Sequence, residues 1–133
     1  MNNIEIFKDS LQNIMAFVIK RNHQSEGINF LSDEKDYLQV ATMSHKSGHI
    51  ILPHYHNKIP RQVDMTCEAL IIKKGTLKVN LYENKSIVHS FTVSSGDILI
   101  LLSGGHGFEV IDDVDMVEIK QGPFMGLADK TRF

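Results

Sequence analysis

The chain has 133 residues, a length typical of one domain, and 42% of these residues are hydrophobic while 23% are charged. These proportions exclude a disordered chain, and a net charge of −2 from 14 basic and 16 acidic residues argues against a nucleic-acid-binding surface. The longest purely apolar run, residues 98–102, is far too short to span a membrane, so we expect neither a nucleic-acid nor a membrane partner.

Two further features bear on the compartment. The first residues lack the basic and apolar regions of a secretory signal peptide. Cys67 is the single cysteine, which excludes an intrachain disulfide framework and a cysteine-rich zinc site. We therefore expect a cytoplasmic protein.

Along the chain, turn residues separate short apolar runs. Residues 2–15 fit either a short helix, with Phe7, Leu11 and Ile14 on one face, or a strand followed by a turn. Residues 57–67, with Pro60 inside them, predict a loop. The runs between and after these segments predict strands at 15–19, 27–30, 37–43, 48–56, 68–72, 76–82, 86–93, 97–102, 106–111 and 116–120.

The spacing of these strands predicts the fold class. Glycine, asparagine or aspartate residues lie between most of them and predict tight turns at 73–75, 83–85, 94–96, 103–105 and 112–113. Strands that recur every 8 to 12 residues or so indicate an all-β sandwich or barrel. Closure of the sheet edges favours a barrel or jelly roll. We find no repeat or linker, so we expect one domain over residues 1–133.

Residues 48–56 carry the first sign of chemistry. In a strand the side chains of His54 and His56 point the same way, about 7 Å apart, and can share a metal ion. Ile50 and Leu52 lie on the same face, which therefore points into the barrel. Two histidines exposed to water at a strand end are the competing interpretation.

Two further residues could complete such a site. Glu68 begins an apolar strand, and a carboxylate buried there needs a cationic partner, either a metal ion or a basic side chain such as Arg61 or Lys78. His106 lies in a glycine-rich turn that leads into another strand, although the same glycines also fit a simple hairpin.

These spacings resemble the cupin superfamily. The pattern Gly-x5-His-x-His-x11-Glu-x6-Gly over residues 48–75 is similar to the first cupin motif. Residues 96–106, from Gly-Asp to Gly-Gly-His, are similar to the second motif, with Leu102 in the usual place of a proline. The spacing of 11 residues before Glu68 is longer than is usual in the family. The resemblance covers residues 36–120 and implies a cupin-like jelly-roll barrel with a short N-terminal extension.

The resemblance also implies a metal site and a substrate neighbourhood. It assigns His54, His56, Glu68 and His106 as ligands of one divalent metal ion inside the barrel. Imidazole and carboxylate donors suit Fe, Mn, Ni, Zn or Cu. The chain looks closest to small cupins found beside surface-polysaccharide and sugar-nucleotide biosynthesis enzymes, and such cupins commonly form homodimers. A small sugar-related metabolite is therefore the expected ligand.

Residues beside the four expected ligands could contact the substrate. Arg61 and Gln62 lie in the loop between the ligands, where they could orient a phosphate or carboxylate of the substrate. We expect the other four histidines to be packed or solvent-exposed and Cys67 to be a buried structural thiol; these histidines are His23, His45, His49 and His89. The leading hypothesis is an enzyme. A non-catalytic binding protein with a structural metal, and a metal-free cupin isomerase that uses histidine as an acid–base catalyst, remain open.

Overall fold

The computed structural model describes residues 3–133, and nearly all of its regular structure is β. No helix in this range is long and apolar enough to cross a membrane. The elements are β1 (Ile4–Lys8), β2 (Ile14–Ile19), β3 (Gly27–Phe30), β4 (Ala41–Ser44), β5 (Glu68–Glu83), β6 (Ser86–Ser94), β7 (Ile98–Leu101), β8 (Gly105–Lys120) and the 3-10 helix η1 (Gly126–Asp129).

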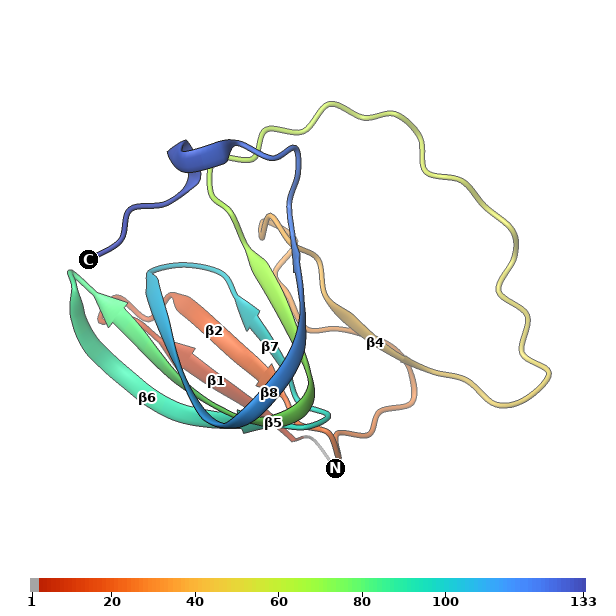
Figure 1. Ribbon diagram of the computed structural model, residues 1–133. Helices are drawn as coiled ribbons and strands as arrows, with labels where there is room; N and C mark the ends of the chain where they lie inside the picture. The colour runs from red at the N-terminus through yellow and green to blue at the C-terminus, as the bar shows by residue number, and fades with distance from the viewer. Residues whose placement is uncertain (1–2) are drawn as a thin grey trace.

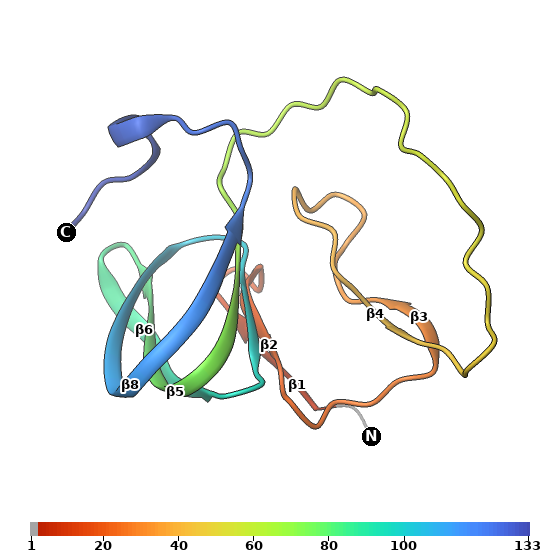
Figure 2. The same ribbon diagram turned by 45° about the vertical axis from the view of Figure 1, so that its right-hand side comes forward.

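The larger sheet has the strand order β1-β2-β7-β5-β6, and β8 pairs with the opposite edge of β5. All of its pairings are antiparallel. The sheet curls strongly into a half-barrel formed mainly by β5, β6 and β8 (Figure 1). β3 and β4 form a separate two-stranded hairpin beside the half-barrel (Figure 2). The all-β prediction is therefore confirmed.

β5 and β8 are long, bent strands. Turns were predicted inside each, at 73–75 and 112–113, but both predictions are wrong because the strands continue through these positions. The register between them shifts three times between Ile72 and Leu77. Gly75 has a φ of +85°, and a Cβ there would overlap the carbonyl oxygen of Asp113. Bulges bend a strand without ending its pairing, which explains why turn-like residues here curl the sheet instead of reversing the chain.

The core lies on the inner face of the half-barrel. Its buried residues come from β2, β5, β6 and β7, and Val18, Leu70 and Leu99 are adjacent across three of these strands. A second cluster covers the outer face of the same strands, where Phe17 and Ile100 pack against residues from the segment 31–40. The part of the sheet around β2 and β7 is therefore covered on both sides.

The bounds of the shorter strands agree with most of the predicted ranges. The strands predicted at 15–19, 27–30 and 86–93 are present within one residue of their expected ends, while β4 is shorter than predicted. Residues 3–15 form the strand-and-turn alternative, not a helix, and residue 2 lies outside the described residues. β1 pairs with β2, so the N-terminal segment is an edge strand of the sheet and not an extension outside it.

The strand predicted at 48–56 is absent. Residues 45–66, which we call the arm, form no strand, and every residue of the arm up to Met65 is exposed. The arm arches away from the half-barrel (Figures 1 and 2). The sequence pattern of a strand is present, but residues 3–133 place no strand beside this segment to supply the backbone hydrogen bonds that a strand needs. The loop predicted at 57–67 is confirmed.

Candidate functional site

The pair formed by Glu68 and His106 is the centre of the candidate site. The Oε2 atom of Glu68 lies 3.3 Å from Nε2 of His106. Glu68 begins β5 and is only 6% exposed, whereas a third of the His106 side chain, 33%, remains exposed to solvent. The carboxylate is therefore held inside the half-barrel and the imidazole stands between it and water.

The order of the strands explains why these residues meet. Leu101, the last residue of β7, is paired with Glu68, and the chain then turns through residues 102–104 before β8 begins. Gly104 has a φ of +77° in this turn, and a Cβ there would come within 2.6 Å of the Met15 side chain. The glycine-rich turn thus places His106 at the mouth of the half-barrel, beside the start of β5.

The environment favours a charged Glu68. Its pKa is lowered by the hydrogen bond with His106 and by the positive charges of Lys120 and Lys130, which together outweigh the opposing effect of burial. A buried carboxylate that stays ionised attracts a cation or a proton donor. This part of the molecule can therefore bind a metal ion or move a proton.

A cavity of about 530 Å³ opens over this pair. Its walls include Tyr82 at the end of β5 and Phe108 on β8, and the C-terminal segment 129–133 lies across it. The ring of Phe133 packs edge-on against Tyr82, with the ring centroids 5.1 Å apart. A cavity of this volume is large enough for a small metabolite.

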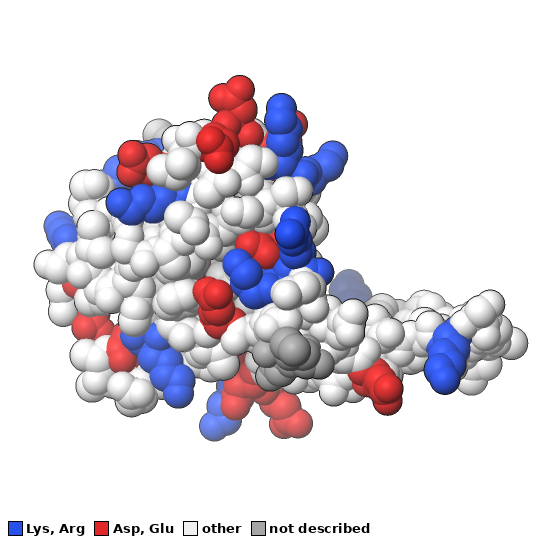
Figure 3. Space-filling model, turned by 90° about the horizontal axis from the view of Figure 1, so that it is seen from below, with Lys and Arg blue, Asp and Glu red and all other residues white. Residues whose placement is uncertain are grey.

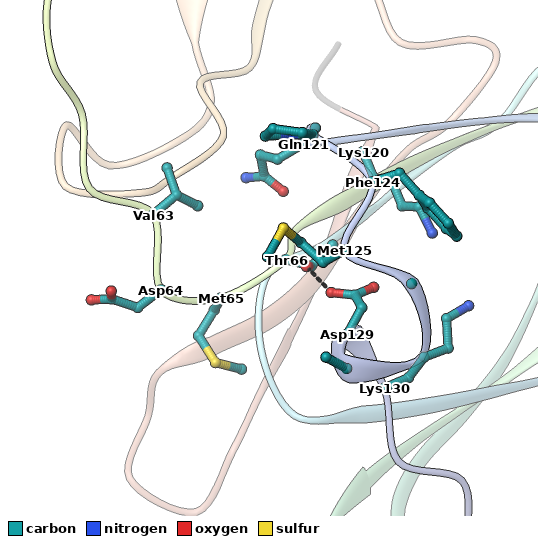
Figure 4. Close-up of a pocket in the computed structure, with 14 residues that line it drawn as sticks. Val63, Asp64, Met65, Thr66, Lys120, Gln121, Phe124, Met125, Asp129 and Lys130 are labelled. Carbon is teal, nitrogen blue, oxygen red and sulfur yellow. Dashed lines mark hydrogen bonds between the residues drawn. The ribbon is translucent and has the colours of Figure 1, made fainter.

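A second cavity of about 450 Å³ adjoins the first one, and both are lined by Met65, Thr66, Asp129 and Lys130. Figure 4 shows it between the end of the arm and the segment that contains η1, where the Thr66 hydroxyl donates a hydrogen bond to the Asp129 carboxylate. This bond links the arm to the C-terminal segment.

The structure leaves the other predicted ligands away from the pair. His54 and His56 lie on the exposed arm, with ring centroids 5.5 Å apart, and Nδ1 of His54 is 2.9 Å from the Leu52 carbonyl oxygen. The two imidazoles are therefore neighbours, but the strand that was predicted to hold them is absent. Within residues 3–133, no three His, Cys, Asp or Glu side chains lie close enough together to hold a metal ion.

The two predicted substrate-binding residues are also on the arm. Arg61 is exposed, and the Gln62 side-chain amide donates a hydrogen bond to Asp64 at 3.0 Å. Neither residue lines the cavity over Glu68 and His106. The four residues predicted as metal ligands are therefore separated: Glu68 and His106 lie in the half-barrel, whereas His54 and His56 lie on the exposed arm.

The remaining histidines and the cysteine have other surroundings. His45 and His49 stack on each other at the base of the arm, with centroids 4.1 Å apart. His89 bonds to the Lys8 carbonyl oxygen through Nε2, at 2.7 Å. Cys67 is buried, and burial raises the pKa of its thiol. Burial and a raised pKa are typical of a structural cysteine.

The residues that close the cavity carry only a weak signal in the sequence. Lys130 and Arg132 line it together with Tyr82 and Phe133. These residues reach the cavity because the C-terminal segment folds back across the half-barrel. Neither hydrophobic periodicity nor a motif predicts this fold-back.

The chain matches no family model, and neither the curated proteins nor the solved structures contain a match to it.

Proposed function

We propose that this chain is a cupin-type metal-binding protein of the cytoplasm, and that it is an enzyme acting on a small polar metabolite such as a sugar or sugar nucleotide. The metal ligands in this proposal are Glu68 and His106 from the half-barrel, and His54 and His56 from the arm. The completed fold would be the jelly-roll barrel that the sequence pattern resembles.

The contact between Glu68 and His106 is the observation that supports this function best. A carboxylate that is 6% exposed, with a pKa lowered by its surroundings, lies 3.3 Å from an imidazole nitrogen, and both groups line a cavity of about 530 Å³. Carboxylate oxygen and imidazole nitrogen are common ligands of Fe, Mn, Ni and Zn. Only the pair meets in the structure, so metal binding by all four residues requires the arm to move.

A bound metal ion would supply Lewis-acid polarisation of a carbonyl or hydroxyl group. The residues of the chain have separate tasks. Tyr82, Phe108 and Phe133 shape the cavity and exclude water, while Lys130 and Arg132 attract a negatively charged group of the substrate. In this proposal Arg61 and Gln62 approach the substrate together with His54 and His56, because they lie on the same arm.

The same contact favours a second candidate, a metal-free isomerase. A carboxylate beside an imidazole can hold the ring in one orientation, which acid–base catalysis requires. Here His106, which faces the cavity, would transfer the proton and Glu68 would position it. A non-catalytic protein with a structural metal would use the four ligands without an open coordination position.

Elemental analysis of protein purified without a histidine tag tests the metal proposal. We expect close to one metal ion per chain in the wild type and little in His54→Ala/His56→Ala. The matched control is His45→Ala/His49→Ala, which removes two histidines from the same arm and should keep the metal. Absence of metal from the wild type after reconstitution would contradict the proposal and leave the metal-free isomerase.

A further inference from the structure

The outer edge of β8 is an open edge of the sheet. β8 pairs with β5 over nearly its whole length, and among residues 3–133 no strand pairs with its other edge. Such an edge presents a row of unpaired backbone N–H and C=O groups that readily bind a further strand. β8 is therefore an acceptor for a strand.

β8 carries exposed apolar side chains on both of its faces. Phe108 and Val110 are paired with buried residues of β5 and so lie on the inner face, yet they are 37% and 56% exposed. Val117 and Ile119 lie on the outer face and are 43% and 49% exposed. Strands that are apolar on both faces are typical of sheets covered on both sides. The half-barrel therefore lacks a wall beside β8 and a layer outside it.

The arm has the composition of that missing strand. Ile50 and Leu52 are each 76% exposed, and in an extended strand they would share one face with His54 and His56, whereas Ile51 and Tyr55 would share the other face. The segment 48–56 is thus apolar on both faces and long enough to pair with half of β8. The Tyr37 hydroxyl donates a hydrogen bond to the Asp64 carboxylate, at 3.3 Å, which ties the C-terminal end of the arm to the segment before β4.

We propose that two copies of this chain exchange their arms, so that residues 48–56 of each copy add as a strand to the free edge of β8 in the other copy. This inference rests on the proposed function in one respect. The exchanged strand brings His54 and His56 of one copy to Glu68 and His106 of the other, so each metal site is complete only in the dimer. In a two-fold exchange the arm and the β8 edge of each copy are both paired, so no third copy can add to the assembly.

The surroundings of the arm favour a second copy over closure within one chain. In Figure 2 the β3–β4 hairpin lies between the arm and the half-barrel. Ile28, Phe30 and Met43 form an exposed apolar face of this hairpin, 53–66% exposed, and β4 leads directly into the arm. In Figure 3 the part of the molecule that projects to the right, on the side where Figure 1 shows β4 and the arm, carries few charged side chains. An arm folded onto its own β8 would leave this hairpin face and the outer face of β8 uncovered, whereas a second copy can cover both.

Analytical ultracentrifugation tests the exchange without reference to metal. We expect a dimer for the wild type and a monomer for Ile50→Lys/Leu52→Lys. The matched control is Ile87→Lys, an exposed apolar residue of β6, 55% exposed, which should leave the dimer intact. All three side chains are exposed, so circular dichroism should show the same fold in each variant. A monomeric wild type, or a dimer that survives the two lysines, would overturn the proposal.

Co-expression of two defective chains tests whether the site is shared. One chain carries His54→Ala/His56→Ala and the other carries Glu68→Gln/His106→Ala, so neither should bind metal alone. Exchange predicts about one quarter of the wild-type zinc content, because about half of the dimers are mixed and each mixed dimer has one intact site.

The result also separates this inference from the proposed function. A wild-type chain that binds zinc but gives no recovery in the mixture keeps the function and overturns the exchange. A dimer that the lysine variants dissociate but that binds no zinc keeps the exchange and contradicts the metal site.

Discussion

Glu68 and His106 are in contact although they lie at opposite ends of the ribbon that β5 and β8 form. Glu68 is paired with Lys120 at the end of β8, and His106 is paired with Leu81 near the end of β5. The curl of the β5–β8 ribbon brings its two ends together, so that the carboxylate and imidazole lie 3.3 Å apart. The candidate site therefore depends on the bend in these two strands.

Gly75 is essential for this bend. Its φ of +85° and the closeness of the Asp113 carbonyl oxygen leave no room for a side chain. We expect Gly75→Ala to lower the free energy of unfolding by about 3 kcal/mol, from backbone strain and steric overlap together. Urea denaturation measures the change.

Gly48→Ala is the control for this prediction. Gly48 has a similar φ of +89°, but nothing lies within 4 Å of its Cβ position. Its substitution should cost only about 1 kcal/mol. Equal losses for the two variants would show that steric overlap at Asp113 is unimportant.

Asp97 should make the fold sensitive to acid. Its carboxylate is 2% exposed, and although burial raises its pKa, hydrogen bonds from the Ser94 amide, the Lys20 ammonium and the Arg21 amide lower it by more. Because the pKa is lower in the folded state, the stabilisation is present above the unfolded pKa of about 3.9. It is lost as the pH falls through the folded value.

Asp97→Asn should remove about 2 kcal/mol of stability at pH 7, because the amide cannot accept all three bonds or neutralise Lys20. Denaturation from pH 7 to pH 2 measures the difference between wild type and variant. We expect this difference to shrink at the acidic end. A constant difference would contradict the assignment to the ionised carboxylate.

Glu68→Gln should separate the two roles of the carboxylate. The amide keeps the size of the side chain, so we expect a stability loss of about 1–2 kcal/mol from the weakened bond to His106. Metal content should fall to background, because a neutral amide is a poor ligand. Full metal retention together with the expected stability loss would assign Glu68 a purely structural role.

Metal should stabilise the wild type through the arm. At a free metal concentration about 100 times Kd, binding adds about 2.7 kcal/mol, which raises Tm by roughly 5–10 °C. His54→Ala/His56→Ala should have the wild-type Tm without metal, since both side chains are exposed, and should show no increase with metal. An equal increase in both proteins would exclude the arm from the site.

The sequence predicted the strands of the fold better than their shape. Short apolar runs between turn residues located β2, β3 and β6. The same pattern divided β5 and β8 into two strands each, because Gly75 and the Asp112–Asp113 pair look like turns when the opposite strand is not known. A bend within a long strand and a reversal of the chain both place glycine or aspartate between apolar runs. The sequence alone therefore does not distinguish them.

The candidate site was predicted in part. A buried carboxylate at the start of a strand predicted a partner for Glu68, and the structure supplies His106. The position of His54 and His56 on the exposed arm could not follow from the sequence, because alternation does not show whether a neighbouring strand is present to pair with. The C-terminal segment that crosses the cavity carries no signal of its own.

X-ray absorption spectroscopy of the metal-loaded protein tests the central claim most directly. The fine structure at the metal edge counts imidazole ligands. We predict coordination by the imidazoles of His54, His56 and His106 together with a carboxylate oxygen, and loss of two imidazoles in His54→Ala/His56→Ala. A wild-type spectrum with a single imidazole, unchanged in the variant, would show that the arm takes no part in the site and would contradict the account.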